Sequence, residues 1–325
     1  MSQSTTAQII RETLAAELRR DPRLFLMGED IGAYGGSFGV TRGLLAEFGD
    51  QRIRNTPISE SGFVGTAIGA AVAGMRPVVE IMFMDFITQA VDQLVNMAAK
   101  LHYVYGLNCP LVIRTAMGAG RSYGATHSQC LERLYFGVPG IKIVAPASGA
   151  DFAALLQGAI ADPNPVLFLE HKLLYPLRWE MPETPPEPVA PGSARIARAG
   201  TDVTIIGWSW MAFEAERAGA SLADKEVEAE VIDLRSLAPL DMATLLASAG
   251  KTRRVLIVEE GPRTGGVAAE IAAQIAEQLP DGLDFPVQRL AMPDCPVPSA
   301  RTMEAALMPN AATIAAAALD LATRV

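Results

Sequence analysis

Short apolar runs alternate along this chain with longer segments in which apolar residues recur at helical spacing. In the first part of the chain, the runs that predict strands lie at 24–27, 77–83, 110–115, 142–145 and 166–170. Segments 90–101 and 149–161 carry the helical spacing and predict helices. Because strands that are apolar throughout must be covered on both faces, the alternation indicates parallel sheets flanked by helices.

A proline-rich segment interrupts this alternation. Residues 181–191 read MPETPPEPVAP, which has five prolines and no periodic pattern, so we expect an extended connector. Beyond it, strands are predicted at 203–208, 230–234, 255–259 and 287–290, and helices at 211–222, 241–248 and 267–279. The pattern predicts an α/β protein of two doubly wound parallel-sheet domains, over 1–180 and 199–325, joined by a linker over 181–198.

The composition fits a globular protein with a large core. The chain has 325 residues, 50% of them hydrophobic, with a net charge of −9 and a sequence pI near 5.0. This acidic balance offers no basic stripe to phosphate backbones or anionic lipids, so we expect no nucleic-acid and no membrane partner. No apolar run reaches about 18 residues without a charge or a proline, so no spanning helix is expected.

The cysteines and the N-terminus indicate a cytoplasmic protein. Cys109, Cys130 and Cys295 are odd in number and lack Cys-x-x-Cys spacing, so neither a disulfide framework nor a zinc site is expected. Residues 1–20 are amphipathic and carry acidic side chains, which predicts the first helix of the fold rather than a signal peptide.

Glu60 is the lone carboxylate at the point where a polar turn gives way to an uncharged run of small residues over 63–74. Burial against such a helix would raise the pKa of the carboxyl and suit it to general acid/base work. A residue of the first helical turn, stabilised by the helix dipole, explains the position equally well.

His127 is the candidate acid/base group among the three histidines. It follows a buried strand and a glycine-rich segment over 117–121, and a histidine in such a loop would lie at the edge of the sheet. A loop histidine bonded to the backbone is the alternative. His102 and His171 have no partner at metal-ligand spacing and are expected to be structural.

Two glycine-rich segments could bind phosphate. Residues 32–39 match neither G-x-G-x-x-G nor Walker A, so a loop is the better interpretation. Residues 264–266 precede a predicted helix whose N-terminus could bind an anion, although a tight strand-to-helix connection would look the same. Phe83 and Phe86 follow a predicted strand and could stack on a ring-shaped ligand or pack in the core.

Seven segments in one order resemble the β subunit of the E1 component of 2-oxo acid dehydrogenase complexes, the thiamine-diphosphate-dependent pyruvate, branched-chain 2-oxo acid and acetoin dehydrogenases. These segments are GEDIG (28–32), VTRGL (40–44), TPISESG (56–62), GMRPVVEIMFMDF (74–86), HSQ (127–129), VIDLRSLAPLD (231–241) and EEGPRTGG (259–266). The resemblance covers nearly the whole chain. It implies a transketolase-like protein with an N-terminal pyrimidine-binding domain and a transketolase-type C-terminal domain.

The resemblance also implies a role for the site residues. Glu60 would bond N1′ of the cofactor's aminopyrimidine and so promote removal of the thiazolium C2 proton. His127 would assist at the substrate carbonyl and in transfer to a lipoyl group. The residues implied to line the cofactor pocket are Glu29, Ile58, Ser59, Met82 and Phe86, and those near the substrate are Phe83, Met84 and Asp85. The segments that resemble a potassium site contain Leu111, Ala159, Ile160, Asp162 and Asn164.

One family motif is absent from the sequence. No Gly-Asp-Gly is followed downstream by Asn-Asn, the pattern that holds the diphosphate through Mg²⁺. In the resembling family this pattern lies on a separate E1 α subunit. The resemblance therefore implies half of a cofactor site, an α2β2 heterotetramer, and transfer of the acyl unit to the lipoyl group of an E2 acyltransferase.

The substrate and two other functional classes stay open. Met82 stands where branched-chain members often have Gln, and Arg121-Ser122-Tyr123 does not indicate one substrate subclass. A non-catalytic scaffold subunit of the same fold and a self-sufficient transketolase-like enzyme are the alternatives.

Overall fold

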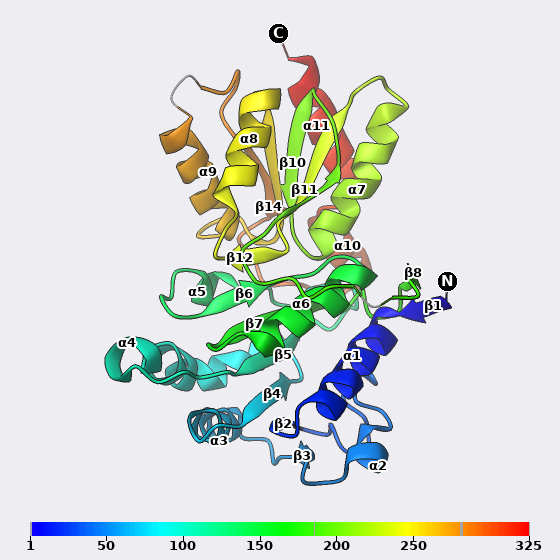
Figure 1. Cartoon of the computed structure of the whole chain (residues 1–325). Coiled ribbons are helices and arrows are strands. Elements are labelled where there is room, and N and C mark those ends of the chain that lie inside the picture. The colour runs from blue at the N-terminus through cyan, green and yellow to red at the C-terminus, as the bar shows by residue number, and fades with distance from the viewer. Residues whose placement is uncertain (1, 185, 280–281, 325) are drawn as a thin grey trace.

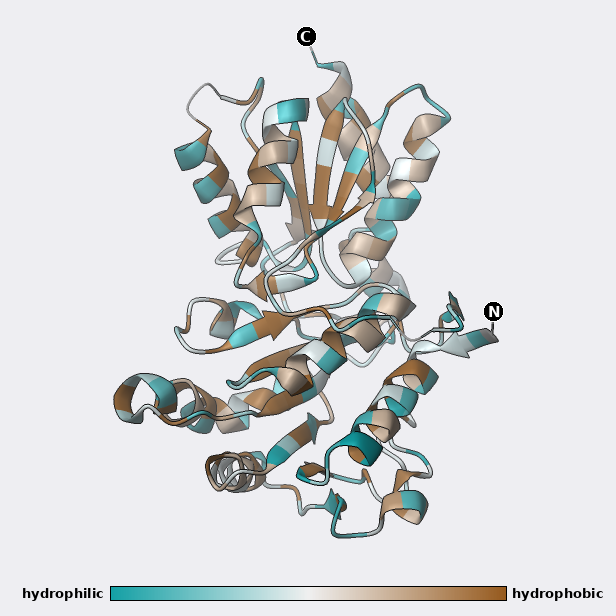
Figure 2. Cartoon of the chain, viewed as in Figure 1, coloured by the Kyte–Doolittle hydropathy of each residue, from teal (hydrophilic) through white to brown (hydrophobic). Residues whose placement is uncertain are grey.

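Two α/β domains stack on one another, with the chain running from the lower domain to the upper one (Figure 1). The computed structural model describes residues 2–184, 186–279 and 282–324. Figure 2 shows the strands as mostly hydrophobic, whereas the helices carry hydrophilic residues on their outer faces. This is the distribution expected for sheets that helices cover on both sides.

The lower domain is built on a seven-stranded sheet in the order β12-β6-β7-β5-β4-β2-β3. All neighbouring pairs are parallel except β12 with β6. The strands are β2 (Leu24–Gly28), β3 (Ile53–Asn55), β4 (Arg76–Ile81), β5 (Val112–Met117), β6 (Lys142–Val144), β7 (Val166–His171) and β12 (Ser236–Ala238).

Helices cover both faces of this sheet. Alternate residues of β2 show it: Leu24 and Leu26 pack in one hydrophobic cluster with α1 and α6, while Phe25 and Met27 pack in another with α3. This alternation is the period of two of a strand buried on both faces. The helical elements are α1 (Thr6–Arg20), α2 (Leu44–Phe48), α3 (Glu60–Val72), η1 (Met84–Ala90), η2 (Gln93–Ala98), α4 (Leu101–Tyr105), α5 (Arg133–Phe136) and α6 (Gly149–Ala161).

The upper domain is built on a five-stranded sheet in the order β14-β13-β10-β11-β9, parallel except for β9 at its edge. Helices α7 and α11 cover one face, and α8 and α9 cover the other (Figure 1). The strands are β9 (Arg195–Arg198), β10 (Val203–Gly207), β11 (Ala229–Asp233), β13 (Val255–Pro262) and β14 (Gln288–Met292). The helices are α7 (Trp210–Ala223), α8 (Met242–Thr252), α9 (Val267–Gln278), α10 (Arg301–Leu307) and α11 (Ala311–Thr323).

The two domains share a hydrophobic cluster and one strand. One hydrophobic cluster contains both Leu167 of the lower sheet and Ile257 of the upper sheet. Strand β12 lies beyond the proline-rich segment in sequence but completes the lower sheet. A two-stranded antiparallel ribbon of β1 (Ser2–Thr5) and β8 (Arg178–Met181) adds a further pairing at the N-terminus.

The predicted fold class is confirmed, with several differences at the level of elements. The antiparallel strands β9 and β12 lie at sheet edges, where they need no apolar run long enough to be recognised. The helix predicted over 90–101 is a 3₁₀-helix, a π-helix and a short α-helix in succession. Ala90, Leu94 and Ala98, which recur at helical spacing in this segment, are buried, but the spacing does not specify the hydrogen-bond register.

One stretch of the described chain has the length and hydropathy of a membrane-crossing helix, contrary to expectation. It spans Arg301–Thr323 and contains two helices, α10 and α11, rather than one. Asn310 begins the second helix by accepting hydrogen bonds from the amides of Ala312 and Thr313, each at 3.1 Å. Ile314, Ala318 and Leu321 of α11 pack in the upper core with α7, which is the packing of a core helix.

Candidate active site

The predicted site residues gather at one edge of the lower sheet. Glu29 directly follows β2, Met82 directly follows β4, and the loop with His127 follows β5. These three strands are neighbours and run parallel, so their carboxyl ends meet at the same edge. In open α/β sheets this edge is where ligands bind.

Glu60 is the first residue of α3, where the helix dipole favours a negative charge. Its side chain is buried, although Ser59 and Ser61 on either side are exposed. No hydrogen bond from the described part of the chain reaches its carboxylate. The carboxylate oxygens are therefore available to a ligand.

Glu29 lies within electrostatic reach of Glu60. Its Oε1 atom is buried and has no hydrogen-bond partner among the described residues. Burial, together with the negative charges of Glu60 and Asp30, raises the pKa of Glu29 to about 7. The site thus contains two neighbouring acids, one of which can hold a proton near neutral pH.

Ile58 lies two residues before Glu60 and is 83% exposed. Its side chain therefore adds an exposed apolar group next to the buried acid. Ser59 is exposed as well and makes no side-chain bond that caps α3.

The segment after β4 places Phe83 and Phe86 around His127. The His127 ring lies edge-to-face with both phenylalanines, at centroid distances of 5.1 and 5.2 Å. All three side chains are partly exposed, as is Met82. Helix α3, which begins at Glu60, packs against η1, which contains Phe86.

The other two predicted substrate residues are buried. Met84 belongs to the core, and its sulfur accepts a hydrogen bond from the Leu131 amide. Asp85 accepts from the side-chain amide of Gln129 at 2.8 Å and from its backbone amide at 3.3 Å. These contacts hold the chain downstream of His127 rather than presenting the side chains to a substrate.

Carboxylates of the upper domain hold the glycine-rich loop that leads to His127. Glu304 of α10 accepts from the amides of Gly120 and Ser122, each at 2.9 Å. Glu260 of β13 accepts from the Ala119 amide at 2.6 Å and lies 2.7 Å from Nε2 of His171. The sequence reasoning missed these residues because their partners in the loop lie more than a hundred positions away.

The glycine-rich segment 264–266 faces an internal carboxylate. It precedes α9, and Glu259 lies at the N-terminus of this helix, where its Oε2 accepts from the Ala268 amide at 3.4 Å. A side chain of the chain itself therefore occupies the place that an external anion could have taken. Burial and the charge of Glu132 raise the pKa of Glu259 to about 7.

The residues of the predicted potassium site lie together, but two of their oxygens already face protein cations. The carbonyl of Ile160 accepts from the Arg76 guanidinium at 2.5 Å, and the carboxylate of Asp162 pairs with Lys142. Asp162 also accepts from the Asn164 amide at 2.9 Å. This arrangement fits a bound potassium ion poorly, and we derive no role from one.

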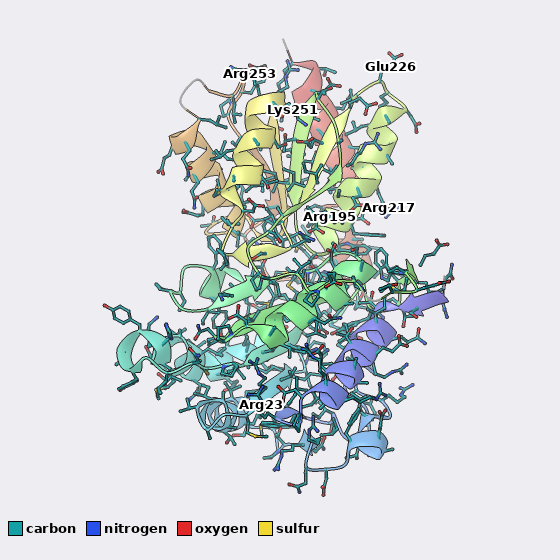
Figure 3. The ribbon with its side chains drawn as sticks, in the orientation of Figure 1. Arg23, Arg195, Arg217, Glu226, Lys251 and Arg253 are labelled. Atoms are coloured by element: carbon teal, nitrogen blue, oxygen red, sulfur yellow. The ribbon has the colours of Figure 1, made fainter. Side chains whose placement is uncertain are left out.

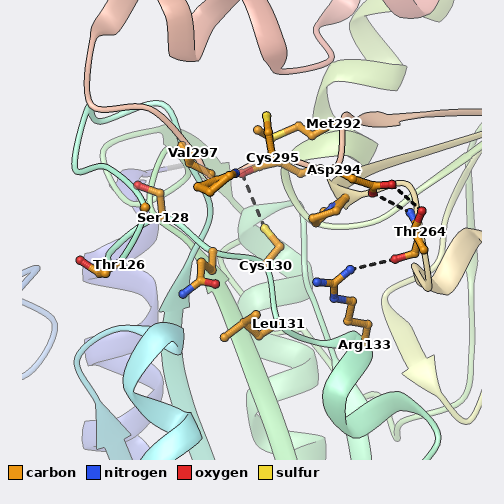
Figure 4. Close-up of a pocket in the computed structure, with 16 residues that line it drawn as sticks. Thr126, Ser128, Cys130, Leu131, Arg133, Thr264, Met292, Asp294, Cys295 and Val297 are labelled. Atoms are coloured by element: carbon orange, nitrogen blue, oxygen red, sulfur yellow. Dashed lines mark hydrogen bonds between the residues drawn. The ribbon is translucent and has the colours of Figure 1, made fainter.

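A cavity of about 680 Å³ lies between the domains on the other flank of the His127 loop (Figure 4). Its walls include Ser128, Cys130 and Arg133 of the lower domain and Thr264 and Cys295 of the upper one. Arg133 donates to the Thr264 carbonyl at 2.9 Å across the cavity. Neither Glu29 nor Glu60 lines it, so it is separate from the acidic pair.

Sequence and structure comparisons define the class of protein. The transketolase pyrimidine-binding domain family matches residues 2–178, and the transketolase C-terminal domain family matches residues 192–314. A solved structure described as "Split gene transketolase, inactive beta4 tetramer" superposes with a TM-score of 0.78 at 23% identity, covering 98% of both chains. The fold is therefore that of the transketolase superfamily.

Curated relatives narrow this to one family. The chain is 43% identical to the pyruvate dehydrogenase E1 component subunit beta-1 of Arabidopsis thaliana, over 94% of this chain and 86% of that protein. It is 44% identical to the acetoin:2,6-dichlorophenolindophenol oxidoreductase subunit beta of Cupriavidus necator, over 95% and 94%. The chain belongs to the β-subunit family of thiamine-diphosphate-dependent E1 enzymes.

Proposed function

We propose that this chain supplies the aminopyrimidine half of a thiamine diphosphate site, which a separate E1 α subunit completes with the diphosphate and Mg²⁺ half. The assembled enzyme decarboxylates a 2-oxo acid or cleaves acetoin, and passes the acyl unit to a lipoyl group. The observation that carries this proposal is the buried, unpartnered Glu60 beside Glu29, next to the exposed Ile58.

The acidic pair suits the aminopyrimidine. Glu60 can donate a hydrogen bond to N1′ or accept its proton, and the buried Oε1 of Glu29 can accept from the cofactor or its waters. Phe86 offers a partly exposed ring for stacking, and Ile58 and Met82 offer apolar contact. Bound thiamine diphosphate supplies the electron sink, while the protein groups orient it and tune its protonation.

His127 has the position of a substrate group in this arrangement. Its ring lies against Phe83 and Phe86, and Phe86 is in the 3₁₀-helix that packs against the helix beginning at Glu60. Its Nδ1 atom lies 3.1 Å from the Thr126 hydroxyl, which leaves Nε2 to face a substrate carbonyl.

A partner chain is supported by apolar side chains left at the surface of the lower domain. They cluster after β4, on η2, α4 and the turn that follows, and hydrophobic colour is visible on α4 (Figure 2). The most exposed are Met97, Tyr103, Val104 and Tyr105, at 49%, 91%, 56% and 69%. A face of this kind is typical of an interface between subunits, and we propose that it is buried in an α2β2 assembly.

The cytoplasm stays our proposal for the compartment. Cys109, Cys130 and Cys295 are all free thiols, as expected of a reducing environment. Relatives include mitochondrial proteins, so an organelle matrix would satisfy the same chemistry.

Reconstitution tests the proposal. The chain is purified alone and together with an α subunit of the same family, and dye reduction is followed with thiamine diphosphate, Mg²⁺ and either pyruvate, 2-oxoisovalerate or acetoin. We expect turnover only in the mixture, with one preferred substrate. Turnover by the isolated chain would indicate a self-sufficient enzyme, and a stable complex that binds no cofactor would indicate a scaffold subunit.

A further inference from the structure

Lys172 is a buried lysine to which the proposed function assigns no role. It directly follows β7, the strand next to β5 in the lower sheet, so it lies at the same carboxyl edge as the proposed active site. Its side chain is fully buried, with a relative exposure of 0%. Burying a charged lysine costs free energy unless the ammonium finds hydrogen-bond or charge partners.

The Lys172 ammonium contacts the His127 loop directly. Its Nζ donates a hydrogen bond to the backbone carbonyl of His127. It also lies 5.2 Å from the ring centroid of Phe83 and 5.4 Å from that of Tyr123, both within cation–π range. The same ammonium therefore touches the histidine's backbone and one of the two rings that pack against its imidazole.

The pKa of Lys172 is lowered, because burial outweighs the negative charges around it. Burial lowers the pKa of Lys172, while Asp85, Cys130, Glu260 and Glu304 act in the opposite direction. Three of these four groups hold the same loop: Asp85 bonds Gln129, Glu260 bonds Ala119, and Glu304 bonds Gly120 and Ser122. Lys172 thus lies within electrostatic reach of the carboxylates that hold the loop.

The carboxylate contacts do not reach the part of the loop around His127, where Lys172 binds. The loop is held before His127 by Glu260 and Glu304, and after it by Asp85. Between these points His127 makes a turn bond, from its amide to the Gly124 carbonyl at 3.3 Å. Lys172 fixes the carbonyl side of the same residue.

We propose that Lys172 is the positioning residue of His127, which holds the loop backbone so that the imidazole stays between Phe83 and Phe86 and faces the substrate. The inference rests on the proposed function of His127 and adds a residue to which that function gives no role. Because displacing a catalytic group by about 1 Å can cost about a hundredfold in rate, removal of the ammonium should lower turnover by about tenfold to a hundredfold.

A double-mutant cycle tests this in the reconstituted αβ enzyme. Lys172→Met replaces the buried ammonium by an apolar side chain of similar length, which removes both the charge and the hydrogen bond to the His127 carbonyl. Lys172→Gln keeps a donor without the charge and serves if the first variant does not fold. His127→Asn removes the imidazole, and kcat and KM are measured for each single variant and for both changes together.

We expect Lys172→Met to lower kcat when His127 is present. In the His127→Asn background the same substitution should change kcat less than about twofold, because the free-energy effects of two residues that act through one another do not add. Cofactor affinity should stay within about twofold in each variant. Lys251→Met is the matched control: it removes a lysine bonded to the buried Glu230 in the upper domain, far from the loop (Figure 3), and should leave kcat unchanged.

Multiplicative losses in the double variant, or full activity of both Lys172 variants, would overturn the positioning role. An αβ enzyme that is inactive before any substitution would instead overturn the proposed function on which it rests.

Discussion

Buried carboxyl groups with raised pKa values are the main feature at the scale of single residues. Glu132 of the lower domain has its Oε2 buried without a partner among the described residues, while its Oε1 accepts from the Trp208 indole at 3.4 Å. Burial raises its pKa to about 7, and the Glu260 charge acts in the same direction. Its charge in turn contributes to the raised pKa of Glu259 across the domain junction.

These shifts predict that Glu132→Gln stabilises the protein at alkaline pH. An acid whose folded-state pKa is about 7, against an ordinary value of 4.5, stabilises the fold while it is neutral. That contribution is lost as the pH rises through this window, because the unfolded chain releases its proton first. The amide stays neutral, so the variant should gain about 2 kcal/mol in unfolding free energy near pH 8.

Denaturant unfolding of both proteins near pH 5 and pH 8 measures the difference, which should nearly vanish at the lower pH. Glu226→Gln is the control, because Glu226 is exposed at the rim of the upper domain (Figure 3). A Glu132→Gln variant less stable than the wild type at both pH values would show that the carboxylate makes a favourable ionic contact instead.

At the scale of elements, the glycine-rich loop after β5 depends on close approach as well as on backbone conformation. Gly118 has a φ of +94°, and a Cβ atom there would lie 1.9 Å from Nε2 of His171. His171 bonds Glu260, which in turn holds Ala119. A side chain at position 118 would therefore displace the contacts that hold the loop.

Gly118→Ala should lower kcat of the αβ enzyme by at least about tenfold, because it moves the loop that contains His127. Gly74→Ala is the control, since Gly74 has a φ of +97° but no atom within 4 Å of an added Cβ. Both variants place a side chain at a similar positive φ, so a difference in their kcat values reports the clash with His171. Equal activities would contradict the importance of this contact.

The sequence predicted those elements whose signals are local. The strands and most helices follow from apolar runs and helical spacing, and Glu60 was found because it stands where a polar turn meets an apolar helix. Strand β12 was missed because it is short and pairs with a strand about ninety positions away. No local pattern distinguishes such an edge strand from a loop.

The supporting residues of the site could not be predicted for the same reason. Glu304 meets Gly120 across 184 positions, and Lys172 meets His127 across 45. The run Glu170-His171-Lys172 at the end of an apolar strand was the available signal, because all three polar residues are buried. Which residues they contact depends on the order of strands in the sheet, and no local pattern in the sequence specifies that order.

At the scale of the whole molecule, the two domains act as one support for the His127 loop. Beyond the shared core and β12, ion pairs join them: Arg235 of the upper domain bonds Asp151 of α6 at 3.1 Å, and Arg195, which lies at the junction in Figure 3, bonds both Asp151 and Asp233. The C-terminal domain thus helps to hold the loop, because its Glu260 and Glu304 accept hydrogen bonds from the loop amides.

We propose that Glu60 activates a thiamine cofactor that this chain shares with a partner chain. Hydrogen–deuterium exchange at C2 of the bound cofactor measures this step before any substrate is involved. In the reconstituted αβ enzyme, Glu60→Gln should slow the exchange by about a hundredfold or more, whereas Glu226→Gln should leave it unchanged. Exchange at the wild-type rate in a Glu60→Gln enzyme that still binds thiamine diphosphate would contradict the account.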